Sequence, residues 1–341
     1  MRRAIGVFLI WAAGMGLLAT LLVGAGMAMH YWQQPLTAET TTLTVESGQS
    51  MPTIAKSIHE VQPAIPARAI DWTARFRGQA RKIQAGEYEV RPDERLASLL
   101  DRMVAGDVIE YRFTVPEGVT AQAFLDRLAE APRIRRTIDE LAPQAVIEAL
   151  DLPVDHLEGW LYPDTYQYPA GTSDRAIIQR AFSQMQEALD AAWAARADDL
   201  PLENPYEALI LASVIEKETG ISGERGEVAG VFVNRLKRGM RLQTDPTVIY
   251  GMGEDYDGRL FSRHLREDTP YNTYMRDGLP PTPIALPSAA SLQAATHPAP
   301  TDALYFVADG TGGHDFSRTL KEHNRAVARW RAHQREQGDR P

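Results

Sequence analysis

The stretch Tyr206-Glu-Ala-Leu-Ile-Leu-Ala-Ser-Val-Ile-Glu-Lys-Glu-Thr-Gly220 carries the strongest structural signal in the C-terminal part of this chain. From Ala208 to Ile215 it is apolar on almost every face of a helix, and such a helix is normally buried. Glu216 follows the apolar run without a break, and Gly220 offers a C-terminal stop. A carboxylate at the end of a buried helix is partly desolvated, which suits a general acid. The alternative is a helix whose polar end has simply reached solvent.

The amino terminus carries a candidate membrane span. Arg2 and Arg3 form a cytoplasmic tail at residues 1–3, and residues 4–29 carry no charge. At about 1.5 Å per residue, this run is long enough to cross a hydrocarbon core of roughly 30 Å. The two arginines favour a cytoplasmic amino terminus. We therefore expect a single pass through the cytoplasmic (inner) membrane, with residues 30–341 on the periplasmic side.

Two further signals bear on this span. Tyr31 and Trp32 fall where an aromatic belt would meet the far interface. Small residues between Gly24 and Ala28 keep open the alternative of a cleaved signal peptide, although its apolar stretch would be shorter, at about 7–15 residues.

The composition describes the rest of the chain. Of the 341 residues 24% are charged, and the net charge of −9 argues against a nucleic-acid surface. Since cysteine is absent, disulfides, thiol nucleophiles and cysteine metal sites are excluded. The histidines show no paired spacing, so we expect no metal site and no cofactor. Typical domain sizes predict two units outside the span.

The first unit should be a small α/β or α+β module. Its strand-like runs at 43–45, 88–90 and 111–115 are each followed by a predicted helix, near 50–58, 96–104 and 121–128. The pairs Thr44-Val-Glu-Ser-Gly48 and Thr114-Val-Pro-Glu-Gly118 suggest a weak internal repeat.

The second unit should be mainly helical with a small sheet at its edge. Ser173 predicts the start of a helix whose core stripe runs from Ile178 to Trp193. A helix over 223–237 follows the one that carries Glu216. Residues 130–172 and 241–288 are predicted to be mostly loop, because they are dense in Pro, Gly, Asn and Thr. Further elements are expected as a short helix at 291–295, a strand at 303–307 and a closing helix at 320–333.

Several blocks together resemble the MltG/YceG-like family of endolytic murein transglycosylases, in the order typical of that family and over roughly residues 40–330. They are Glu158-Gly-Trp-Leu-Tyr-Pro-Asp-Thr165, Leu211-Ala-Ser-Val-Ile-Glu-Lys-Glu-Thr219, Val231-Phe-Val-Asn-Arg-Leu236, Gly239-Met-Arg-Leu-Gln-Thr-Asp-Pro-Thr-Val-Ile-Tyr-Gly251, Tyr271-Asn-Thr-Tyr274, Gly278-Leu-Pro-Pro281, Tyr305-Phe-Val-Ala-Asp-Gly310 and Gly313-His-Asp-Phe316.

The resemblance implies a domain plan. It comprises the span at 4–29, a linker at 30–40, a LysM-like module at 41–130 and a catalytic domain at 131–341. The LysM-like module would bind glycan, and the alternative is a spacer that sets the height of the catalytic domain above the membrane. The implied partners are peptidoglycan strands and the glycan-polymerising penicillin-binding proteins.

The resemblance also implies a reaction. Glu216 falls on the catalytic position, where one carboxyl protonates the bond between MurNAc and GlcNAc and then deprotonates the C6 hydroxyl, so that 1,6-anhydro-MurNAc forms. The enzyme would be a lyase that terminates nascent glycan strands. One alternative is a non-catalytic peptidoglycan-binding scaffold. Another is a muramidase, which would need a second carboxylate about 5–9.5 Å away; by motif, Asp245 is the nearest candidate.

Five further residues are predicted to bind substrate. Their amide, hydroxyl, aromatic and carboxylate groups suit an amphipathic glycan, and they are Gln243, Thr244, Tyr271, Asn272 and Glu218. A turn cap for Asn272 and packing for the tyrosines are the alternatives. Glu218 should point about 200° around the helix from Glu216, and its alternative is a surface charge.

Three further expectations concern single residues. Glu224 and Glu227 are interpreted first as residues that cap the next helix, and His314 is expected to brace its turn. The chain departs from the family at Thr282 and Ser288, which stand where glycine is common, so the shape of that loop is left open.

Overall fold

A computed structural model describes residues 2–33, 35–37, 39–221 and 223–338. The chain divides into two compact units, unit 1 with Met1–Tyr111 and Gln167–Thr172, and unit 2 with Arg112–Tyr166 and Ser173–Pro341. The division falls before residue 112 and not at the predicted boundary after residue 130. The physical reason is an aromatic cluster in which Phe113 lies 5.2 Å from Phe124 and 6.0 Å from Tyr166, between ring centroids. This cluster fastens residues 112–130 to unit 2.

Unit 1 is built around an antiparallel pair of strands. Its elements are α1 (Arg2–Gln33), β1 (Thr41–Val45), α2 (Met51–Val61), α3 (Ala67–Phe76), β2 (Gly86–Val90) and α4 (Leu96–Ala105). Leu43 lies opposite Tyr88 in the β1–β2 register. The helices cover this pair with apolar side chains, among them Ile58 and Ile70, each at most 1% exposed. The predicted strand and helix positions are confirmed here, except that α3 was not predicted.

Helix α1 is the one helix of the described chain that is long and apolar enough to cross a membrane, over Gly14–Tyr31. It continues to Gln33 and contacts α3 and α4. Tyr31 packs against the core of unit 1, and Leu36 is a member of that core with 1% exposure. Two residues of the predicted linker at 30–40, Tyr31 and Leu36, thus pack against unit 1. The side chains of Arg2, Arg3 and Trp32 lie outside the described set.

Unit 2 is mainly helical. Its elements are α5 (Ala121–Glu130), α6 (Pro143–Leu150), α7 (Asp174–Ala194), α8 (Pro205–Glu218), α9 (Arg225–Lys237), α10 (Asp245–Met252), α11 (Ala289–Thr296) and α12 (Leu320–Gly338), with short 3-10 turns at Gly253–Asp255 and His264–Arg266. Strand β3 (Glu110–Thr114) pairs with β4 (Thr165–Pro169), and β5 (Tyr305–Ala308) pairs with β6 (His314–Ser317).

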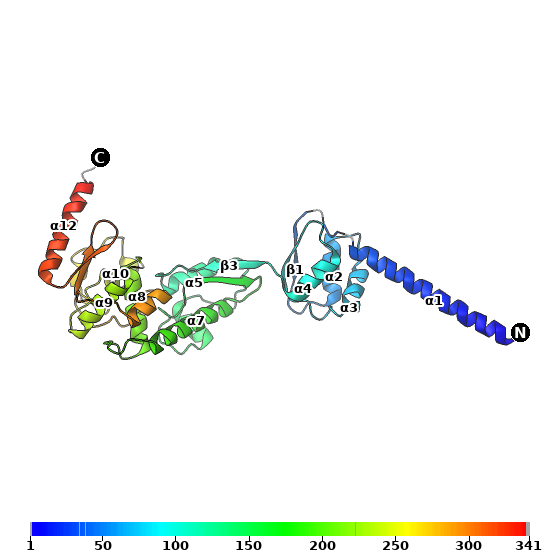
Figure 1. Ribbon diagram of the computed structural model, residues 1–341, viewed down its shortest axis with the longest axis horizontal. Helices are drawn as coiled ribbons and strands as arrows, with labels where there is room; N and C mark the ends of the chain where they lie inside the picture. Colours follow the sequence, from blue (N-terminus) through cyan, green and yellow to red (C-terminus); the bar gives the residue numbers. More distant parts are fainter. Residues whose placement is uncertain (1, 34, 38, 222, 339–341) are drawn as a thin grey trace. The chain divides into compact units, whose positions relative to one another are not determined.

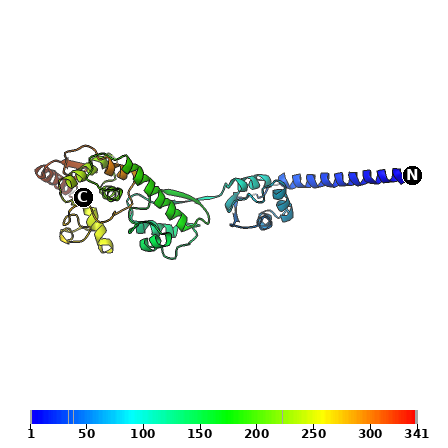
Figure 2. The same cartoon turned by 90° about the horizontal axis from the view of Figure 1, so that it is seen from below.

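The β5–β6 hairpin forms the small sheet expected near the C-terminus. Helix α12 contacts both of its strands (Figures 1 and 2). Three elements lie in segments predicted to be mostly loop: α6, β4 and α10. Prolines explain two of these errors, because Pro143 and Pro246 stand in the first turn of α6 and α10, where proline is tolerated.

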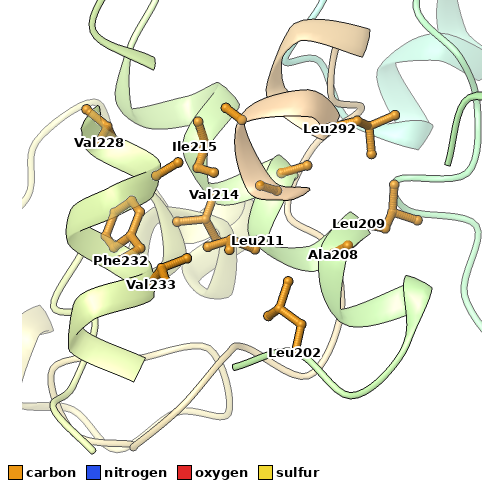
Figure 3. Packing of buried hydrophobic residues seen from close by; sticks show 14 of the residues in the cluster. Leu202, Ala208, Leu209, Leu211, Val214, Ile215, Val228, Phe232, Val233 and Leu292 are labelled. Carbon is orange, nitrogen blue, oxygen red and sulfur yellow. The ribbon is translucent and has the colours of Figure 1, made fainter. Parts of the chain in front are cut away.

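Helix α8 is the centre of the unit 2 core. All eight residues from Ala208 to Ile215 are buried, as their pattern predicts. They pack against α9 and α11, with Leu292 and Phe232 among the contacts (Figure 3). Burial of a side chain such as Leu211 contributes about 1.5–3 kcal/mol. The apolar run therefore anchors the helix firmly, and its polar end is held in one place.

The two ends of α8 are fixed by local hydrogen bonds. Asn204 caps the start, since its side chain accepts from the backbone N–H of Glu207 at 3.1 Å. The helix ends at Glu218, because Thr219 takes an extended conformation with φ of −142°. The Thr219 hydroxyl then accepts from the N–H of Ile221 at 3.0 Å. Gly220 directly follows this cap residue, at the position where the sequence predicts the stop.

Candidate active site

Glu216 lies in the last turn of α8, with its side chain only 7% exposed. Its Oε2 accepts three hydrogen bonds, from the N–H of Ser288 at 2.9 Å, the Ser288 hydroxyl at 2.5 Å and the Ser291 hydroxyl at 2.6 Å. A guanidinium nitrogen of Arg225 lies 3.9 Å from Oε1. Among the described residues, Oε1 accepts no hydrogen bond. One carboxyl oxygen is thus held fixed, and the other is left able to exchange a proton.

The donors to Glu216 come from the first turn of α11. Ser288 is the N-cap of this helix and accepts from the N–H of Ser291 at 3.2 Å. The positive end of the helix dipole therefore faces the carboxylate and adds to the stabilisation of negative charge. The preceding loop is tied to α8 by the buried Ser213 hydroxyl, which accepts from the N–H of Ile284 at 3.0 Å. The departure from glycine at Ser288 thus supplies Glu216 with an additional donor.

A tight turn at Gly118 forms another wall beside Glu216. Gly118 has φ of +73°, and a Cβ there would lie 3.6 Å from Cγ of Glu216. Its carbonyl accepts from Nζ of Lys217 at 3.1 Å, and its N–H donates to Leu286 at 2.9 Å. Lys217 is exposed, as expected. Its bond to the Gly118 carbonyl also holds this turn against α8. The segment before residue 130 contributes directly to the surroundings of Glu216.

A second carboxyl, Glu158, is buried in unit 2 with 8% exposure. It accepts from the N–H of Ala121 at 2.9 Å and from the Tyr250 hydroxyl at 3.1 Å. Burial raises its pKa to about 7, although these two donors and the charge of Lys217 act in the opposite direction. Glu158 thus joins α5 to α10 and changes its charge near neutral pH.

Glu218 faces a different segment from Glu216, as the spacing of two residues predicts. It accepts a hydrogen bond from the Thr244 hydroxyl. Burial raises the pKa of Glu218, and the negative charge of Asp245 adds to the rise, whereas the bond from Thr244 lowers it. The interpretation of Glu218 as a surface charge is therefore wrong. Asp245 itself accepts from the Tyr274 hydroxyl at 2.6 Å.

Gln243 has a strained backbone. Its φ is +52°, a conformation that costs a residue other than glycine roughly 1–2 kcal/mol. The surrounding contacts hold it there: its N–H donates to Thr273 at 3.2 Å, and the buried Arg235 donates to the Leu242 carbonyl at 2.7 Å. Such outliers cluster at functional sites. The Gln243 side chain is exposed, so its predicted contact with substrate stays open to test.

Tyr271 and Asn272 lie close in sequence but in different surroundings. The Tyr271 hydroxyl is 2.9 Å from that of Thr282, so the other departure from glycine supplies a partner here too. Asn272 is fully buried, and its amide donates to the carbonyls of His264 at 3.1 Å and Glu267 at 2.6 Å. Its oxygen accepts from the N–H of Tyr274 at 2.9 Å. In this structure Asn272 stabilises its own loop through these three hydrogen bonds.

The structure therefore divides the predicted site residues. Thr244 contacts Glu218, as its hydroxyl donates to that carboxylate. Glu216 has three other partners that the sequence did not predict, namely Ser288, Ser291 and Arg225. The Ser288-Ala-Ala-Ser291 pattern is a helix start, but nothing local indicates that it faces Glu216.

Glu224 occupies the N-cap position of α9 and Glu227 lies in its first turn, as expected. Glu224 makes no side-chain cap bond to α9, and its carboxylate instead lies 2.7 Å from Nδ1 of His314. The same pair holds the turn between β5 and β6, so the expected bracing role of His314 is confirmed.

Comparisons with known proteins identify the family. A model of the YceG-like family matches residues 43–329. A protein of Bacillus subtilis named endolytic murein transglycosylase is 31% identical over 309 residues, which cover 85% of each chain. A protein of the same name from Streptococcus pneumoniae is 29% identical over 265 residues, 73% of this chain and 47% of that protein.

A solved structure agrees with this assignment. The crystal structure of a yceG-like protein from Listeria monocytogenes is 29% identical and covers 84% of this chain and 98% of that one, with a TM-score of 0.52. The family match spans Glu216, its seryl donors and both segments around Glu218. The predicted resemblance is confirmed, and the chain belongs to the YceG-like family.

Proposed function

We propose that this protein is an endolytic murein transglycosylase that cleaves the MurNAc–GlcNAc bond within glycan strands. Its named relatives are lytic transglycosylases, which are lyases, so the prediction of an enzyme of this class is confirmed. The observation that carries the proposal for this chain is the asymmetry of the Glu216 carboxyl. Oε2 has three donors, and Oε1 accepts no hydrogen bond from the described residues.

Glu216 performs both proton transfers in the proposed reaction. Protonated at Oε1, it donates to the glycosidic oxygen as the bond to C1 of MurNAc breaks. The C6 hydroxyl of the same sugar attacks C1, and its proton returns to Oε1. The ring closes as 1,6-anhydro-MurNAc, no water is consumed, and the carboxyl is regenerated.

The surroundings of Glu216 support its negatively charged state. Between the two transfers the carboxylate is negative, and the donors from Ser288 and Ser291 stabilise that charge on Oε2. The guanidinium of Arg225 at 3.9 Å acts in the same sense. Because these groups are fixed by α9 and α11, little reorganisation is needed during the reaction.

We also propose that α1 anchors the protein as a single span in the cytoplasmic membrane, with both units on the periplasmic side. The apolar stretch Gly14–Tyr31 supports this. The tether would confine cleavage to new glycan near the membrane, so the enzyme would terminate strands made by glycan-polymerising penicillin-binding proteins. Protease added to spheroplasts should then digest nearly the whole chain, and full protection would exclude this topology.

Unit 1 is proposed to be a LysM-like module. Its β1–α2–α3–β2 order forms one core, and a groove between β1 and α2 is lined with hydroxyl groups that suit a glycan. The lining includes Thr37, Thr40, Thr42, Thr44, Ser57 and Glu60. If unit 1 is only a spacer, replacing Thr42 and Thr44 with alanine will leave sedimentation of the full chain with isolated peptidoglycan unchanged.

Mass analysis of digested peptidoglycan tests the activity. Anhydro ends identify a lyase, and reducing ends identify a muramidase that uses water. A protein that binds the polymer but releases no fragments is a scaffold. The Glu216→Gln protein is the matched control, because any product that it still releases comes from a contaminating enzyme.

A further inference from the structure

We infer that helix α3 of unit 1 lies on the membrane surface beside the end of α1, with Trp72 and Phe76 in the lipid interface. This inference rests on the proposed membrane anchor. It concerns a second contact with the bilayer, separate from the span itself.

Trp72 and Phe76 are unusually exposed for large aromatic residues. Trp72 is 75% exposed and Phe76 is 92% exposed. Outside α1, no other large hydrophobic residue of unit 1 is exposed in the described part of the chain. The two side chains stand four positions apart on α3, so they share one face of the helix. The opposite face is anchored in the core through Ile70 and Ala74, both fully buried.

Charges on the same side of α3 suit a lipid surface. Arg68 and Arg75 are exposed and lie at the i and i+7 positions, which places them in the stripe with the two aromatic rings. Arg75 is paired with Asp71 at 2.9 Å, yet its side chain remains 58% exposed. Arg81 and Lys82 follow shortly after the helix and are exposed as well. Aromatic rings flanked by cations are typical of helices that lie at a membrane interface.

The position of α3 next to α1 indicates that the partner of its exposed aromatic face is the lipid bilayer. Tyr31, at the end of the apolar stretch Gly14–Tyr31, packs against the core to which Ile70 and Ala74 belong. Helix α1 contacts α3 directly (Figure 1). If α1 crosses the bilayer, the chain leaves it beside α3, with almost no free linker. Aromatic residues are favoured at this depth because their rings are apolar and tolerate the headgroup region.

The absence of cysteine gives a direct test. Single cysteines replace Phe76, Leu18 or Ser47 in the full chain, each carries a nitroxide, and the protein is reconstituted in vesicles of phosphatidylethanolamine and phosphatidylglycerol. Leu18 reports on the span, and Ser47 is the aqueous control in the exposed turn after β1. Collision rates with oxygen and with a water-soluble nickel complex give the depth of each label.

We expect the label in Leu18→Cys to lie in the hydrocarbon and the label in Ser47→Cys to lie in water. The label in Phe76→Cys should lie at headgroup depth, with several-fold fewer nickel collisions than the label in Ser47→Cys. A deep Leu18 label with a Phe76 label in water would overturn the α3 contact and leave the anchor intact. A Leu18 label in water would overturn the anchor and this inference together. If the Phe76 label is in water but becomes shielded when soluble glycan fragments are added, the aromatic pair is a glycan surface and the inference is wrong.

Discussion

The Ser288 hydroxyl donates a hydrogen bond of 2.5 Å to Oε2 of Glu216, across 72 positions in the chain. The bond joins the N-cap of α11 to the last turn of α8, the two helices that pack together in the unit 2 core. Because the backbone N–H of Ser288 and the Ser291 hydroxyl reach the same oxygen, the carboxyl is fixed in orientation before any substrate arrives. Such preorganisation is a large part of how enzymes stabilise developing charge.

The seryl donors should contribute to turnover. Ser291→Ala removes one donor, and anhydro-product formation should fall about tenfold, since a hydrogen bond to a charged group contributes roughly 1.5–3 kcal/mol. Ser288→Gly removes the hydroxyl and its cap bond to the N–H of Ser291 but keeps the backbone donor, and glycine is tolerated at an N-cap, so its effect should be smaller. The double variant should lose more activity than either single variant, but less than about 100-fold if the effects add. Melting curves provide the control. Full activity in a folded double variant would show that the hydroxyl groups are not needed.

Glu216→Gln should abolish the chemistry without unfolding the protein. The amide keeps the size of the side chain but cannot deliver or accept the proton, and general acid–base catalysis is typically worth about 10²–10⁴-fold. Glu218→Gln is the matched control, because its bond to Thr244 does not need a charge and it lies on another side of α8. A folded Glu216→Gln enzyme with near-normal turnover would remove Glu216 from the mechanism. Loss of activity only in Glu218→Gln would move the assignment by two residues.

Glu158 should make stability depend on pH. Its pKa is about 7 in the folded chain against an ordinary value of 4.5, so the folded state holds a proton that the unfolded state releases. The stabilisation is full below the unfolded value and is lost as pH rises through about 7, a difference of about 3 kcal/mol. Glu158→Gln should remove this part of the pH dependence of the free energy of unfolding. The stability of the variant relative to the native protein should therefore rise between pH 5 and 8.

Melting temperatures of both proteins across this range give the measurement. The difference between the two melting temperatures at each pH is the quantity to compare. The titration of Glu218 and of other carboxyls common to the two proteins cancels in this difference. Parallel curves for the native and Glu158→Gln proteins would show that Glu158 is ionised throughout and that its burial in the folded protein is less complete.

Asn272→Ala separates two roles. Three hydrogen bonds connect the Asn272 side chain to its own loop, so the variant leaves the N–H of Tyr274 without a partner. The carbonyls of His264 and Glu267 each lose one donor and keep one from a backbone N–H. An unpaired buried group costs about 1–3 kcal/mol, and the melting temperature should fall by several degrees. A direct role in glycan binding predicts instead an unchanged melting temperature and a raised KM. Gln243→Ala is the comparison, since that side chain is exposed and should affect KM alone.

Much of the fold follows from local sequence. The apolar run from Ala208 to Ile215 determines a buried helix, because no orientation of that segment exposes a polar face. The uncharged run near the amino terminus determines α1 in the same way. Short strands and capped helices were also predictable, since turn residues and apolar spacing mark them. The prolines at the starts of α6 and α10 misled the prediction, because the same residue is found both in loops and in the first turn of a helix.

Local sequence also singles out one carboxylate, since Glu216 is the first polar residue after the apolar run and lies within the family motif. The groups around Glu216 follow from tertiary contacts instead. Ser288 and Ser291 reach Glu216 from 72 and 75 positions away, and Gly118 closes on it from an earlier segment. Burial of Glu158 and Glu218 was decided in the same way. Such contacts depend on how helices pack in space, and local periodicity records which face of a helix is apolar but not which segment will cover it.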